Sequence, residues 1–224
     1  MKTSLVVLCA SAVVCVLLGC GQESGVVPVT TQPAARTKPA QTQPQTQPRP
    51  KGHITHVVYV IDRSGSMMDS FDYLKNALAD SISRLRPSQD FHIVMFSEGA
   101  PIELAGKRLV PATDANKFAA GKFLKGVNTS GGTDPKPALK RAFEVLADAG
   151  GGGGKLIVFV TDGDFPGENE HVLALIKKLD PEREVQINTY IYKDREDKAG
   201  KEVLEKIARD SGGNYKFFCT KDAE

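Results

Sequence analysis

The sequence has little of the chemistry that common hydrolytic enzymes need. It contains no Gly-x-Ser-x-Gly segment and no recognisable arrangement of Ser, His and Asp. The glycine run Gly150–Gly154 follows a helical pattern, whereas a phosphate-binding loop follows a strand and opens a helix. The histidines are scattered without the spacing of metal ligands: His53, His56, His92 and His171. We therefore expect a protein that is not an enzyme and that binds no small-molecule substrate.

The folded part of the chain also lacks an excess of positive charge. The whole chain carries a net charge of +2, of which Lys2 contributes +1 and residues 21–52 contribute +3. Residues 53–224 are therefore left with −2. This balance gives no basic footprint for nucleic acid, and we expect no nucleic-acid partner.

No apolar run is long enough to cross a bilayer comfortably as a mature helix. The longest, Leu5–Leu18, has fourteen residues and follows Met1-Lys2, which suits a signal peptide. It ends in Leu17-Leu18-Gly19-Cys20, which resembles a bacterial lipobox. The resemblance implies a signal peptide over residues 1–19 and a lipid on Cys20, with the protein exported and anchored to the outer membrane or to a periplasm-facing membrane. The alternative is an ordinary secretory signal with an incidental cysteine.

Cysteine is scarce once that leader is set aside. Cys9 and Cys15 would leave with the signal peptide and Cys20 would carry lipid, so Cys219 has no partner within the chain. Because Cys219 falls in a strand pattern, we expect it to be a small buried apolar residue.

Residues 20–52 are rich in Pro, Gln and Thr and include a short repeat, Gln41–Pro44 followed by Gln45–Pro48. This composition buries too little apolar surface to offset the entropy of ordering, so we expect a disordered tether. The remaining residues, 53–224, have the length of a single domain.

The strongest pattern in that domain is an apolar run, Val57–Ile61, followed by Asp62. Five apolar residues without polar alternation predict a strand buried on both faces. Apolar residues then recur at steps of three and four, which predicts a helix over Met67–Leu85. Asp62, Ser64 and Ser66 would thus lie beyond the carboxyl end of a parallel strand, where open α/β sheets bind ligands.

Strand and helix patterns alternate through the rest of the domain. The spacing predicts an α/β fold with a Rossmann-like, doubly wound, mainly parallel sheet and helices on both faces. The further strands are expected at Phe91–Ser97, Lys155–Val160, Val185–Tyr192 and Asn214–Cys219, with edge pieces at Ile102–Leu104 and Arg108–Val110. Further helices are expected over Ala115–Phe123, from Asp134 and Pro135 to about Ala149, around Val172–Leu179 and around Val203–Ile207.

The Asp-x-Ser-x-Ser spacing at Asp62, Ser64 and Ser66 places one carboxylate and two neutral oxygens around a single point. A hard divalent cation favours such ligands. The stretch resembles the metal-ion-dependent adhesion site (MIDAS) of von Willebrand factor type A domains. The two other parts of that site also have matches, Thr133 in Gly-Gly-Thr-Asp and Asp162 after a later strand.

The resemblance implies that Asp62, Ser64, Ser66 and Thr133 bind a divalent cation, with Asp162 binding directly or through water. Mg²⁺ is the expected cation, and Mn²⁺ is the alternative. Because neutral hydroxyls leave the charge of the cation under-neutralised, a carboxylate from the Asp or Glu of a partner protein would complete its coordination.

Each of these residues also has a simpler structural interpretation. Ser66, with Asp69 three residues later, has the spacing of a helix cap, and Asp162 could be a turn acid before Gly163. Asp134 and Asp164 are candidates for the layer of groups around the ligands. The alternatives are a helix N-cap for Asp134 and a solvated side chain for Asp164.

The function expected from the resemblance is a membrane-anchored, metal-dependent protein-binding module of the bacterial cell envelope. One alternative is a structural envelope protein with a vestigial metal site. Another is a haloacid-dehalogenase-like phosphohydrolase with Asp62 as nucleophile. That chemistry requires a second Asp as general acid, two residues after the nucleophile, and the chain has Ser64 at that position.

Overall fold

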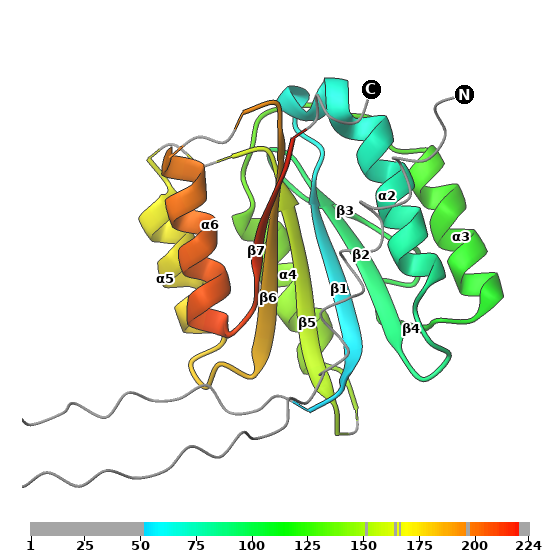
Figure 1. Cartoon of the computed structure of the whole chain (residues 1–224). Helices are drawn as coiled ribbons and strands as arrows, with labels where there is room; N and C mark the ends of the chain where they lie inside the picture. The colour runs from blue at the N-terminus through cyan, green and yellow to red at the C-terminus, as the bar shows by residue number, and fades with distance from the viewer. Residues whose placement is uncertain (1–51, 151, 164, 166, 196–197, 220–224) are drawn as a thin grey trace, which may run out of the picture.

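A seven-stranded sheet runs through the protein, with the strand that ends in Asp62 between two parallel neighbours (Figure 1). The computed structural model of the chain describes residues 52–150, 152–163, 165, 167–195 and 198–219. Its strands are β1 (Ile54–Asp62), β2 (Asp90–Phe96), β3 (Ile102–Glu103), β4 (Val110–Pro111), β5 (Gly154–Thr161), β6 (Val185–Lys193) and β7 (Tyr215–Cys219). Their order is β3-β2-β1-β5-β6-β7, with β4 also paired to β2. Only the short strands β3 and β4 pair antiparallel among the described residues.

Helices cover both faces of this sheet. They are the 3₁₀ helix η2 (Gly65–Ser70) and the α-helices α2 (Phe71–Ser83), α3 (Asp114–Lys125), α4 (Lys136–Ala147), α5 (Asn169–Leu179) and α6 (Lys198–Ser211). In Figure 1, α2 and α3 lie on one side and α4 is seen behind the strands. The Rossmann-like, mainly parallel α/β fold is therefore confirmed.

Two apolar cores hold the layers together, and β1 contributes to both. Tyr59 and Ile61 pack in the core with α2 and α3, while Val58 and Val60 pack in the core with α4, α5 and α6. This alternation follows from the period of two in a strand. Burying one large apolar side chain contributes about 1.5–3 kcal/mol, so a run buried on both faces fixes the strand firmly.

The parallel pairing brings several chain segments to one edge of the sheet. Asp62 aligns with Phe96 at the end of β2, and Ile61 aligns with Val160 near the end of β5. The loops that follow β1, β2 and β5 therefore leave the sheet side by side. This edge holds the candidate site.

The helix predicted over Met67–Leu85 is wrong at both ends. Its first turns form η2, and the α-helix runs only from Phe71 to Ser83. Met67 is buried in this 3₁₀ segment, and 3₁₀ and α-helical spacing share the step of three residues, so the apolar pattern does not separate them. Pro87 lies just beyond the last turn, which disfavours continuation of the helix.

The predicted start of α4 is off by one residue in its formal bounds, since the helix begins at Lys136 rather than at Pro135. The Asp134 carboxylate nevertheless accepts the backbone N–H of Lys136 at 3.1 Å, as an N-cap side chain does. This hydrogen bond supports the N-cap interpretation of Asp134.

Cys219 is half-exposed, and its Sγ lies 3.5 Å from the carbonyl oxygen of Asp194. The expectation of a buried cysteine is therefore wrong, because β7 forms the edge of the sheet. The predicted signal peptide, Cys20 and nearly all of the tether lie outside the described residues. Within the part that is described, no helix has the length and apolar character needed to cross a membrane.

Candidate metal centre

Asp62 is the buried acid at the centre of the candidate site. Its side chain is fully buried; Oδ1 accepts the backbone N–H of Ser64 at 2.8 Å, and Oδ2 accepts the hydroxyl of Thr161 at 2.8 Å. Burial raises the pKa of Asp62 to about 6, against the hydrogen bonds from Ser64 and Thr161. The charge of nearby Asp162 adds to the increase. A cation beside Asp62 would favour the charged carboxylate.

The two serines of the Asp-x-Ser-x-Ser stretch lie together beside this acid. Ser64 Oγ is 3.0 Å from Ser66 Oγ. Ser64 is buried, whereas Ser66 is exposed at the beginning of η2. The backbone N–H of Met67 donates to the carbonyl of Ser64 at 3.1 Å, which closes the turn that brings the hydroxyls together.

The loop that carries Thr133 is held against the same turn by backbone hydrogen bonds. The N–H of Ser130 donates to the carbonyl of Arg63 at 2.8 Å, and the N–H of Gly65 donates to the carbonyl of Gly131 at 3.0 Å. At the other end of the loop, the N–H of Asp134 donates to the carbonyl of Ser97 at 2.9 Å. Thr133 lies between these fixed points, and its side chain is exposed.

Asp162 directly follows β5, whose last residue, Thr161, donates its hydroxyl to Asp62. It is half-buried and close enough for its charge to act on the pKa of Asp62. The structure therefore gathers Asp62, Ser64 and Ser66 directly, and places the loop of Thr133 and the position of Asp162 beside them.

Residues 57–165 match the family model described as von Willebrand factor type A domain. The chain contains a von Willebrand factor type A (VWA) domain. VWA domains mediate protein–protein interactions and act as non-enzymatic binding modules.

Among curated proteins, the VWA domain resembles parts of much longer chains. It is 34% identical over 122 residues to inter-alpha-trypsin inhibitor heavy chain H1 of Mesocricetus auratus, a match that covers 51% of this chain and 13% of that protein. It is 33% identical over 116 residues to heavy chain H4 of Homo sapiens, covering 49% of this chain and 12% of that protein. The chain thus spans about an eighth of the length of these relatives.

Solved structures share the fold at lower identity. The von Willebrand factor type A protein from Catenulispora acidiphila aligns with a TM-score of 0.63 and 21% identity, covering 74% of this chain and 39% of that chain. The pilus adhesin SpaC from Lactobacillus rhamnosus GG aligns with a TM-score of 0.62 and 14% identity, covering 76% and 28%. Proximal thread matrix protein 1 from the mussel byssus, solved with a zinc-occupied MIDAS motif, aligns with a TM-score of 0.56 and 20% identity, covering 76% and 43%.

The donors at this edge of the VWA domain fit a hard divalent cation. The candidate ligands are carboxylate and hydroxyl oxygens, which suit Mg²⁺ and Mn²⁺ better than soft metals. The described residues contain no group of three or more His, Cys, Asp or Glu side chains placed to hold a metal. A site in this VWA domain would therefore depend on hydroxyl ligands as well as on Asp62 and Asp162.

Two further residues belong to the surroundings of the site and were not predicted. Glu98 lies two residues beyond β2, and its carboxylate accepts the N–H of Gly132 at 3.2 Å. Thr161 is a buried hydroxyl at the end of an apolar strand. The signal for Thr161 was its polarity in that position, and the signal for Glu98 was its place at the carboxyl end of a parallel strand.

Of the two acids expected around the ligands, Asp134 lies among the described residues. The Asp134 carboxylate is engaged by the N–H of Lys136 and lies 3.9 Å from Lys136 Nζ. Asp164 lies outside the described residues, so its role stays a prediction.

Proposed function

We propose that the protein is a lipid-anchored, metal-dependent binding module of the bacterial cell envelope, which docks an acidic residue of a partner protein on a divalent cation. The observation that carries the proposal is the buried Asp62 carboxylate beside the Ser64 and Ser66 hydroxyls, at the junction with the Thr133 loop. A cation would stabilise this cluster, because Asp62 is buried and has a second acid, Asp162, as its neighbour.

Asp62, Ser64, Ser66 and Thr133 would hold the cation, with Asp162 bound directly or through water. Mg²⁺ is the proposed ion, with Mn²⁺ as the alternative. When bound, the cation supplies a coordination position for an external carboxylate. The hydroxyl ligands are neutral, so they leave more of the cation's charge available to that carboxylate than a set of protein carboxylates would.

Two of the structural neighbours support this function by analogy. SpaC is described as a pilus adhesin, and proximal thread matrix protein 1 was solved with zinc in its MIDAS motif. The envelope location and the lipid on Cys20 rest on the sequence pattern of residues 1–20.

Capture from detergent-solubilised bacterial envelopes tests the proposal. Immobilised wild-type protein should retain a partner in Mg²⁺ and release it in EDTA, and Asp62→Ala should retain none. Asp80→Ala is the matched control, because it removes an exposed carboxylate from α2. Equal capture by wild type in Mg²⁺ and EDTA, or by Asp62→Ala, would favour a structural protein with a vestigial metal site.

A further inference from the structure

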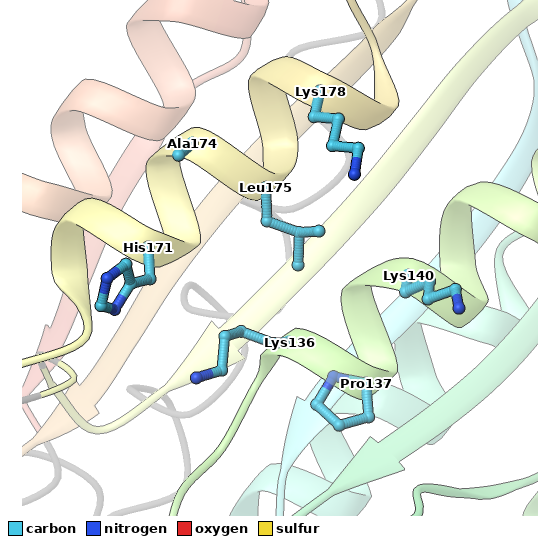
Figure 2. A pocket seen from close by; sticks show the side chains of 7 residues that line it. All are labelled: Lys136, Pro137, Lys140, His171, Ala174, Leu175 and Lys178. Carbon is cyan, nitrogen blue, oxygen red and sulfur yellow. The ribbon is translucent and has the colours of Figure 1, made fainter.

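A groove lies between α4 and α5, and none of the candidate metal ligands lines it (Figure 2). Its volume is about 520 Å³, and it is widely open to solvent. Its lining includes Lys136, Pro137, Lys140, His171, Leu175 and Lys178. Leu175 points from α5 toward α4 in Figure 2, and lysines from both helices border the same space.

The rim of the groove is basic and only partly neutralised. Lys136 forms an ion pair with Glu168, and His171 Nδ1 lies 3.2 Å from the same carboxylate. Lys140 and Lys178 are exposed and have no ion pair with any residue that the structure describes. Two positive charges, one from each helix, therefore border the groove without an ion pair among those residues.

The floor of the groove is apolar. Pro137 and Leu175 line it and are each half-buried, so part of their surface is left to solvent. An occupant that fits both rim and floor needs negative charge at its edges and an apolar group between them.

The beginning of α4, which borders the groove, follows the Thr133 loop directly in the chain. Asp134 follows Thr133 directly, and its carboxylate accepts the N–H of Lys136, which lines the groove.

We propose that this groove binds an acidic segment of the partner protein, with an apolar side chain on Pro137 and Leu175 and carboxylates paired to Lys140 and Lys178. The proposal deepens the proposed function and rests on it only for the anchoring carboxylate at the metal. The groove would favour partners in which the residues near that carboxylate are two further acids with an apolar residue between them.

Charge and shape favour a protein segment over an anionic membrane. The lysines border a shallow groove between two helices, whereas a lipid surface is broad and flat. Residues 53–224 carry a net charge of −2, so an anionic bilayer would repel the domain as a whole. A narrow acidic segment avoids that repulsion because it meets only the groove.

Fluorescence anisotropy with short labelled peptides tests the proposal on the full chain. The probe alternates glutamate with leucine, and its neutral control alternates glutamine with leucine. The groove variant is Lys140→Glu combined with Lys178→Glu. The single variant Lys178→Glu is also measured, and Lys177→Glu is its matched control, because it makes the same charge change on α5 at a residue that lines the α5–α6 side instead.

We expect the acidic peptide to bind wild type more tightly than the neutral peptide, with an affinity that falls as salt is added. The groove variant should raise the Kd about tenfold or more, through lost attraction and new repulsion, while Lys177→Glu should change it little. No binding of the acidic peptide to wild type, or equal binding by the groove variant, would overturn the proposal. If the groove variant loses binding to phosphatidylglycerol vesicles but still binds the acidic peptide as wild type does, the groove binds lipid. That result would also overturn the proposal.

The metal dependence separates this proposal from the proposed function. Peptide binding in EDTA reports the groove alone, and the additional binding in Mg²⁺ that Asp62→Ala removes reports the metal. If Mg²⁺ has no effect but the groove variant still weakens binding, the metal-dependent function fails and the groove stands. If Asp62→Ala matters and the groove variant does not, the reverse holds.

Discussion

At the scale of single residues, the Thr161 hydroxyl is a main support of the buried Asp62 carboxylate. Thr161→Val keeps the shape of the side chain but leaves Asp62 Oδ2 without this donor. The expected loss in the free energy of unfolding is about 1.5–3 kcal/mol, since hydrogen bonds to charged groups contribute most. Urea denaturation at pH 8 in EDTA measures it, because Asp62 is then largely ionised.

Thr189→Val is the matched control for that measurement. Thr189 is also fully buried, but its hydroxyl donates to the neutral carbonyl of Leu204 at 2.9 Å. The loss there should be about 0.5–1.5 kcal/mol. A smaller cost at position 161 than at position 189 would contradict a charged, buried Asp62.

A second prediction at this scale concerns His92, which is buried in β2 with its Nε2 2.9 Å from Glu103 Oε2. Burial lowers the pKa of His92, and the charge of Arg141 lowers it further, while the hydrogen bond and charge of Glu103 act in the opposite direction. Below its unperturbed pKa of about 6.5 the unfolded chain therefore binds more protons at this position than the folded chain. Its contribution to stability is present above that pH and is lost as the pH falls.

Urea denaturation at pH 7.5 and pH 5.5 tests this sign. Wild type should lose more stability over the interval than His92→Gln, which cannot titrate there. Asp62 has a raised pKa and gives the opposite slope, but it is present in both proteins and cancels in their difference. A wild-type protein that loses less stability than His92→Gln on acidification would show that Glu103 dominates over burial.

At the scale of elements, replacing glycine by alanine should have opposite effects on stability at two positions. Gly131 has a φ of +71° in the Thr133 loop, and an added Cβ would lie 3.1 Å from Glu98 Cγ. Gly121 lies within α3, and nothing stands within 4 Å of an added Cβ. Gly131→Ala should therefore destabilise the domain by about 1–2 kcal/mol, and Gly121→Ala should stabilise it by about 0.5–1 kcal/mol.

Thermal and urea denaturation of both variants measure this pair. Gly131→Ala should also weaken any response to Mg²⁺, since it moves the loop that carries Thr133, whereas Gly121→Ala should leave that response unchanged. Equal stability changes of the same sign would mean that the turn at Gly131 does not need its left-handed conformation.

The sequence was most informative about elements whose residues act locally. The apolar runs of β1 and β5 predict buried parallel strands because both faces of each strand are covered. The spacing of Asp62, Ser64 and Ser66 brings their side chains together within one turn, so it could be recognised without the fold.

Contacts between segments that are far apart in the sequence could not be predicted from local patterns. Glu98 meets Gly132 only because two loops leave the same edge of the sheet, and no local spacing encodes that contact. The boundary between η2 and α2 could not be predicted from the sequence either. Met67 and Phe71 are both buried, and a continuous α-helix would show the same apolar spacing.

At the scale of the whole molecule, the proposed lipid on Cys20 predicts where the protein resides. Cys20→Ser should move the protein from the membrane fraction to the soluble fraction or leave its precursor unprocessed. Cell fractionation and mass measurement of the mature chain report both outcomes. Unchanged cleavage and unchanged fractionation would indicate an ordinary secretory signal with an incidental cysteine.

The central claim, a divalent cation on Asp62 and its hydroxyl neighbours, is tested most directly by thermal unfolding in EDTA and in millimolar Mg²⁺ or Mn²⁺. A cation that binds only the folded state adds about 2.7 kcal/mol at a hundredfold excess over Kd, or about 5–10 °C in Tm for a domain of this size. Wild type and Asp80→Ala should show this gain and Asp62→Ala should lose it. Identical melts of wild type with and without metal, together with no heat of Mg²⁺ or Mn²⁺ binding by calorimetry, would contradict the account.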